Sequence, residues 1–150
     1  MVFGFLRRRE EVESLDAFVE KVKCYPSSEI SIQPVAKYKS EGELSNFGTT
    51  GETKCSLVYS TVLHNKTLRF TENFGKEPSH TVPEALCGDT PYQPTIRLLL
   101  TAIERQKMVA KLAPEVTVKI THEKHGYLTD AHNQQVIKDA ERLKLKPYGL

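Results

Sequence analysis

The stretch from Thr95 to Leu112 constrains the fold of this chain more than any other part of the sequence. Its apolar residues return every three or four positions with charged residues between them, which is the pattern of a helix that buries one face. They are Ile96, Leu99, Leu100, Ile103 and Ala110. Pro114 ends the pattern, because proline cannot donate the next helical hydrogen bond. We expect a long helix at the centre of one core.

Two further segments show helical spacing, and four show the alternation of strands. Helices are predicted over Glu10–Lys23 and over Asp130–Lys144, the second with Thr129 or Asp130 as its N-cap. The predicted strands are Glu29–Lys39, Cys55–Leu63, Thr67–Phe74 and Glu115–Thr121, with loops over Glu41–Lys54 and Gly75–Gln93. Pro34 indicates an edge or a bulge in the first strand. The order predicts an α+β fold.

Composition fits one soluble domain over residues 10–150, preceded by an arm over residues 1–9. The chain has 150 residues, of which 39% are hydrophobic and 27% charged, with a net charge of +2. A chain of this length can bury a core without disulfides or structural metal. Cys24, Cys55 and Cys87 lie far apart and are interpreted as buried thiols in a reducing intracellular compartment, either the cytoplasm or an organelle matrix. No apolar run reaches the roughly 20 residues of a membrane span.

The residues between the last predicted strand and the last helix contain groups that can bind metal. Imidazole and carboxylate together suit zinc or another transition metal, and the candidates are His122, Glu123, His125, Asp130 and His132. The two histidines of His122-Glu-Lys-His125 are three residues apart, whereas the zinc-protease motif needs four. Solvated histidines in a polar loop are the preferred interpretation. The sequence therefore predicts no metal and no cofactor.

Two other places were considered for chemistry or binding. Asp89, in Cys87-Gly-Asp-Thr-Pro91, is either a catalytic carboxylate or an ordinary turn residue. The arm combines cations with aromatic residues, namely Phe3, Phe5, Arg7, Arg8 and Arg9. Such a segment can bind RNA, an anionic membrane surface or an acidic protein, or it can dock on its own domain. No nucleophile elbow, phosphate loop or dinucleotide fingerprint is present.

The region from Cys55 to Val136 resembles part of a ribonuclease H-like domain. The resemblance is carried by Cys55-Ser-Leu-Val-Tyr-Ser-Thr-Val-Leu63, Thr67-Leu-Arg-Phe70, Thr95-Ile-Arg-Leu-Leu-Leu-Thr-Ala-Ile-Glu104 and Val116-Thr-Val-Lys-Ile-Thr121. It implies a three-stranded antiparallel meander, a long helix and a fourth strand parallel to the first.

The family's chemistry implies a two-magnesium site held by carboxylates. Carboxylates are expected on the first strand, near the start of the long helix and after the fourth strand. The matching positions here hold Gln33-Pro34, Arg97 and His122-Glu123, so only Glu123 is retained. A guanidinium in place of a metal ligand repels a dication, and the resemblance therefore implies a fold whose catalysis has been lost.

Three hypotheses follow, and the first is preferred. It is a non-catalytic binding or structural module, a subunit or adaptor of a larger protein or ribonucleoprotein assembly, with the arm as a contact. The second is a divergent metal-dependent nuclease or hydrolase of ribonuclease H-like type, with ligands from Asp89, Glu123, His125 and Asp130. The third is an RNA-binding scaffold that uses the arm and the lysines of the last helix.

Overall fold

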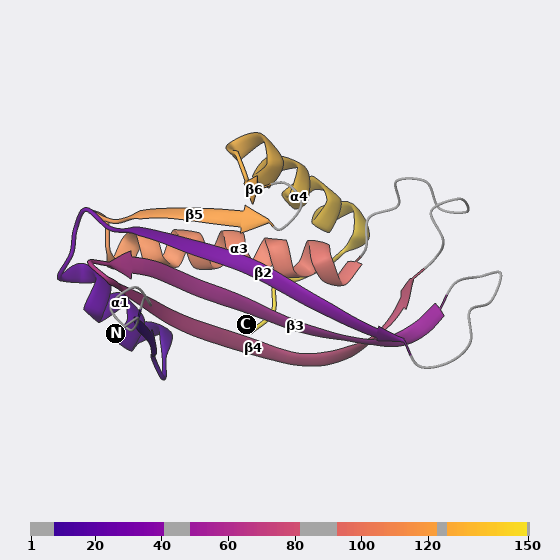
Figure 1. The fold of residues 1–150 in the computed structure, drawn as a ribbon. Helices are drawn as coiled ribbons and strands as arrows, with labels where there is room; N and C mark the ends of the chain where they lie inside the picture. The colour runs from indigo at the N-terminus through magenta and orange to yellow at the C-terminus, as the bar shows by residue number, and fades with distance from the viewer. Residues whose placement is uncertain (1–7, 41–48, 82–92, 123–125, 150) are drawn as a thin grey trace.

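The computed structural model describes residues 8–40, 49–81, 93–122 and 126–149. Within these ranges three helices accompany a six-stranded mixed sheet (Figure 1), which confirms the predicted α+β class. The elements are β1 (Arg8–Glu11), α1 (Leu15–Lys23), β2 (Glu29–Ser40), β3 (Thr49–Leu63), β4 (Lys66–Thr81), α3 (Gln93–Leu112), β5 (Thr117–His122), β6 (Gly126–Tyr127) and α4 (Asp130–Leu143).

The strands lie in the order β1-β4-β3-β2-β5-β6. Strands β2, β3 and β4 form an antiparallel meander, and β5 pairs in parallel with the other side of β2 after the chain has crossed over through α3. Strand β1 adds in parallel to the outer edge of β4. The pairing of β5 with β2 ends at Ile32. Pro34 lies beyond this point, opposite Leu57 of β3, so its missing N–H disrupts no pairing with β5.

Helices α1 and α3 pack on the same face of the sheet. The Phe18 ring of α1 lies 6.1 Å from the Tyr59 ring of β3, and α3 reaches the same tyrosine through Arg105 and Glu72. Helix α4 packs against α3. Fully buried apolar side chains fill the space beneath the helices, and each contributes about 1.5–3 kcal/mol relative to an exposed position. They include Phe18, Val22, Ile30, Ile32, Leu57, Tyr59, Leu68, Leu98, Val109 and Ile120.

The first predicted helix, Glu10–Lys23, is wrong at its start, because the chain first forms β1. The backbone N–H of Val12 donates to the carbonyl of Arg69 at 2.9 Å and so continues the pairing with β4. The helix begins only after Ser14, whose side chain caps it by accepting a hydrogen bond from the N–H of Ala17 at 3.1 Å.

Strands β3 and β4 are longer than predicted, and they include residues that were assigned to loops. β3 begins at Thr49 and β4 continues to Thr81, past Gly75 and Pro78. Asn73 of β4 pairs with Ser56 of β3, and Lys76 of β4 pairs with Lys54 of β3. Two residues of β4 thus lie between these pairs, but only one residue of β3 does. β4 therefore has one extra residue here, a bulge, and Gly75 within it has a φ of +82°.

Replacing Gly75 by alanine is expected to lower the free energy of unfolding by about 1 kcal/mol. An alanine Cβ at this position meets no atom within 4 Å, so the cost comes from the left-handed backbone conformation alone. Gly75→Asn is expected to cost less, because asparagine tolerates this conformation. Urea denaturation of the three proteins measures both effects, and equal stability of wild type and Gly75→Ala would contradict the assigned bulge geometry.

Helix α4 confirms the predicted N-cap. The side chain of Thr129 accepts from the backbone N–H of His132, and the His132 ring accepts in return from the backbone N–H of Thr129. The segment before α4 differs from the prediction. β5 begins at Thr117 rather than Glu115, and the short β6 pairs antiparallel with the end of β5. No helix among the described residues is long and apolar enough to cross a bilayer.

Candidate functional site

The residues that the sequence offers as alternative metal ligands are not gathered at one place where the structure describes them. His122 is half-buried at the end of β5, and Asp130 is exposed at the start of α4. Nδ1 of His132 accepts from the N–H of Thr129 at 3.0 Å, so this nitrogen caps a helix. Glu123 and His125 lie outside the described residues. Within the described ranges, no three His, Cys, Asp or Glu side chains are placed to hold one metal ion.

The other predicted site residues fall mostly outside the described ranges, which exclude Asp89, Phe3, Phe5 and Arg7. Arg8 and Arg9, predicted to belong to a separate arm, are part of β1. Arg9 is exposed and lies opposite Thr67 of β4. The final basic residues of the arm are therefore held at one edge of the sheet.

Cys24 corrects another expectation, since it is exposed rather than buried. It is the C-cap of α1, and its thiol donates to the carbonyl of Glu20 at 3.8 Å. Cys55 is buried as predicted, and its sulfur accepts from the Tyr148 hydroxyl at 3.6 Å. Cys87 lies outside the described residues.

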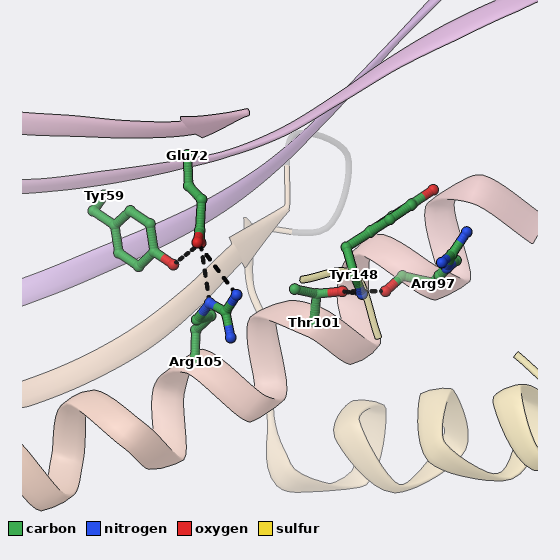
Figure 2. Close-up of polar contacts among 6 residues, drawn as sticks. All are labelled: Tyr59, Glu72, Arg97, Thr101, Arg105 and Tyr148. Atoms are coloured by element: carbon green, nitrogen blue, oxygen red, sulfur yellow. Dashed lines mark hydrogen bonds and ion pairs between the residues drawn. The ribbon is translucent and has the colours of Figure 1, made fainter. Parts of the chain in front are cut away.

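The C-terminal segment occupies the space beside the first turns of α3 (Figure 2). The Tyr148 ring stacks on Phe74 of β4 at 5.2 Å, and the Arg97 guanidinium lies 4.0 Å from the centre of the same ring. Arg97 Nε also donates to the carbonyl of Lys146 at 2.8 Å. Thr101 Oγ1 accepts from the Tyr148 N–H and donates to the Arg97 carbonyl, each at 2.8 Å. Arg97 thus anchors the end of the chain.

A second polar cluster connects α3 to the sheet and is also drawn in Figure 2. The Tyr59 hydroxyl donates to Glu72 Oε1 at 2.8 Å, while Arg105 donates through Nε to Oε1 at 3.0 Å and through a terminal nitrogen to Oε2 at 3.2 Å. Burial, and then the neighbouring carboxylate, raise the pKa of Tyr59. The hydrogen bonds to Glu72 raise the pKa of Arg105. Tyrosine therefore stays neutral and arginine charged, and the cluster works as a fixed bridge.

A cavity of about 480 Å³ opens between α1 and the β3–β4 hairpin. Its charged groups pair with one another, because Glu10 of β1 forms ion pairs with both Lys21 of α1 and Lys66 of β4. Cys24 and His64 also line it. The two lysines are thus used to fasten β1 and α1 to the sheet.

The ion pairs of Glu10 predict a specific loss of stability in acid. Hydrogen bonds from Lys21, and then Lys66, lower the pKa of the Glu10 carboxyl from 4.5 to about 2. Because the folded pKa lies below the unfolded one, the stabilisation is fully present above about pH 4.5 and is lost as the pH falls toward 2. The melting temperature of wild type minus that of Glu10→Gln should therefore shrink over this range. Glu13→Gln, an exposed control, should show no such trend, and a constant Glu10 difference would contradict the pairing.

The face of the sheet opposite α1 and α3 is the surface that no described helix covers. Alternate residues of each strand point to this face, and several of their neighbours on the covered face are fully buried. Val62, for example, is 49% exposed while the adjacent Thr61 is 3% exposed. The open face carries Arg9, Glu11, Glu29, Ser31, Gln33, Val35, Lys37, Lys39, Glu52, Lys54, Ser56, Val58, Ser60, Val62, Thr67, Arg69, Thr71, Asn73, Lys76, Thr117, Lys119 and Thr121.

The open face has a polar centre and cations at its ends. Its middle consists of hydroxyl and amide side chains interspersed with valines, and Ser31 Oγ lies 3.0 Å from Thr121 Oγ1. At one end Lys119 pairs with Glu29 at 3.3 Å, and Arg69 lies 3.6 Å from a Glu11 oxygen. At the other end lie Lys37, Lys39, Lys54 and Lys76. Such a face suits reversible contact with another molecule, because it buries some apolar area and offers many hydrogen-bonding groups.

Comparison of the chain with protein-family models, curated proteins and solved structures gives no significant match in any of the three.

Proposed function

We propose that this chain is a non-catalytic binding module of ribonuclease H-like type, acting as a subunit or adaptor of a larger protein or ribonucleoprotein assembly. The observation that carries the proposal is the open face of the sheet, a broad polar surface with half-exposed valines on the side away from α1 and α3. Such a face offers many side chains over a broad area, which suits contact with a macromolecule.

Strand pairing supports the ribonuclease H-like part of the proposal. The meander of β2, β3 and β4, followed by the crossover helix α3 and a β5 parallel to β2, is the arrangement that the resemblance implies. Because domains of one fold have unrelated functions, the strand pairing supports the proposed architecture of the chain and not its activity.

The surroundings of Arg97 support the absence of catalysis. The resemblance assigns a metal-binding carboxylate to this place near the start of the long helix. Arg97 instead lies over the Tyr148 ring and holds the Lys146 carbonyl. A cation at this position disfavours a bound dication by Coulomb repulsion, and the aromatic ring occupies space beside it. Neither Cys24 nor Cys55 forms a disulfide within the described residues, which fits a reducing intracellular compartment.

The test is quantitative affinity purification from the cells that naturally make the chain, with half of each sample treated with nuclease. Thr71→Glu places a carboxylate in the centre of the open face, and Gln134→Glu places the same group on the exposed side of α4. We expect Thr71→Glu to reduce the captured partners at least tenfold and Gln134→Glu to leave them unchanged. Equal capture by wild type and Thr71→Glu would overturn the proposal. Nuclease sensitivity separates a ribonucleoprotein from a protein assembly.

A further inference from the structure

A row of three lysines crosses the open face at right angles to its strands. Lys37 of β2 lies directly opposite Lys54 of β3, and Lys54 lies directly opposite Lys76 of β4. Directly opposed residues of neighbouring strands share a face, so the three side chains project together. All three are exposed. Since adjacent strands are about 4.8 Å apart, the row spans about 10 Å.

Repulsion among the three lysines destabilises the folded sheet, and ion pairs with neighbouring side chains do not offset it. Like charges directly opposite one another in a sheet are destabilising. None of the three lysines forms an ion pair with an acidic side chain in the part of the chain that the structure describes. Acidic residues of the same surface pair with other cations. Glu11 pairs with Arg69, and Glu29 pairs with Lys119. Glu52 lies opposite Lys39.

The bulge in β4 is what completes the row. Without the extra residue, the alternation that puts Thr71 and Asn73 on the open face would put Gly75 there and turn Lys76 to the covered face. The positive φ of Gly75 permits the bulge and brings Lys76 into line with Lys54. Bulges commonly re-aim a side chain at a functional surface.

We propose that the row of Lys37, Lys54 and Lys76 binds consecutive phosphates of a nucleic-acid backbone. This inference rests on the proposed function, because it takes the open face as the binding surface. A nucleic-acid strand carries one negative phosphate per nucleotide, and a row of exposed lysines is complementary in charge to such a series. A single small phosphate is normally held by convergent backbone N–H groups, whereas the backbone of these strands is engaged in sheet pairing. The hydroxyl and amide groups beside the row are suited to sugar and base edges.

Fluorescence anisotropy with the full chain tests the row, using labelled 20-nucleotide single-stranded RNA, single-stranded DNA and duplex RNA as probes. We expect at least one probe to bind, and the triple variant Lys37→Gln, Lys54→Gln, Lys76→Gln to bind it about 30-fold more weakly near 100 mM salt. The slope of log affinity against log salt should decrease by about 2, since each phosphate of a single strand contributes about 0.7. The preferred probe identifies the form of nucleic acid.

The matched control is Lys23→Gln, Lys107→Gln, Lys111→Gln, which removes the same charge from exposed helical positions. It should keep wild-type affinity and slope. Equal loss in both triple variants, absence of binding to every probe, or equally strong binding of polyglutamate would overturn the inference. The row variant should melt no lower than wild type in low salt, which excludes unfolding as the cause of lost binding. If Thr71→Glu reduces partner capture while the row variant binds nucleic acid normally, only this inference fails, and the binding module stands.

Discussion

Replacing Tyr148 by alanine is expected to lower the free energy of unfolding by about 4 kcal/mol. The ring is 7% exposed, stacks on Phe74 and lies under the Arg97 guanidinium. Truncation removes these contacts and leaves a space between α3 and β4, and aromatic-to-alanine changes in cores typically cost 3–5 kcal/mol. Urea denaturation at neutral pH measures the loss.

Two variants show whether that loss comes from the buried ring. Tyr148→Phe keeps the ring and removes only the hydroxyl contact to Cys55 Sγ at 3.6 Å, so we expect a cost of about 0.5 kcal/mol. Tyr127→Ala truncates a tyrosine that is 53% exposed and should change stability by about 0.5 kcal/mol or less. If Tyr148→Ala cost no more than Tyr127→Ala, the C-terminal segment would not be the anchor described here.

Replacing Arg105 by methionine is expected to cost about 3 kcal/mol. Its side chain is 12% exposed, and its partner Glu72 is 25% exposed. Breaking a buried ion pair by removing one member typically costs 3–5 kcal/mol, because the remaining charge loses its partner. Partial exposure of Glu72 places the expected value at the lower end. Chemical denaturation measures this change as well.

A double-mutant cycle isolates the ion pair from the packing of the side chains. Glu72→Gln combined with Arg105→Met removes both charges, keeps an amide oxygen that can accept from the Tyr59 hydroxyl, and should recover at least about 1 kcal/mol relative to Arg105→Met alone. Lys107→Met, on the exposed side of the same helix, should cost about 0.5 kcal/mol or less. If the free-energy changes of the single substitutions at positions 72 and 105 simply added in the double variant, the bridge between Glu72 and Arg105 would be contradicted.

The elements that the sequence predicts well are those whose own residues determine them. Helices α3 and α4 bury an apolar stripe, and Thr129 caps α4 with a local hydrogen bond. The error at the N-terminus has a physical cause. The spacing of Val12, Leu15 and Phe18 continues across the junction of β1 and α1, and β1 depends on pairing with β4, more than 50 residues away. The same dependence on distant partners explains the strand residues near Gly75 that were assigned to a loop.

The candidate binding surface was harder to predict than the fold. The metal candidates near His122 were chosen by proximity in sequence, but the structure uses His132 to cap a helix. Lys37, Lys54 and Lys76 are far apart in the sequence, and their alignment depends on strand register and on one extra residue in β4. The one local signal was the two-residue spacing of Lys37 and Lys39, which indicates that the end of this strand presents lysines on one face.

The most direct test of the binding surface is site-specific photocrosslinking in the cells that naturally make the chain. A benzophenone amino acid is placed at position 71 on the open face, and in a second protein at position 134 on α4. The account predicts a discrete crosslinked species from position 71 and none from position 134. No crosslink from position 71, or the same species from both positions, would contradict it.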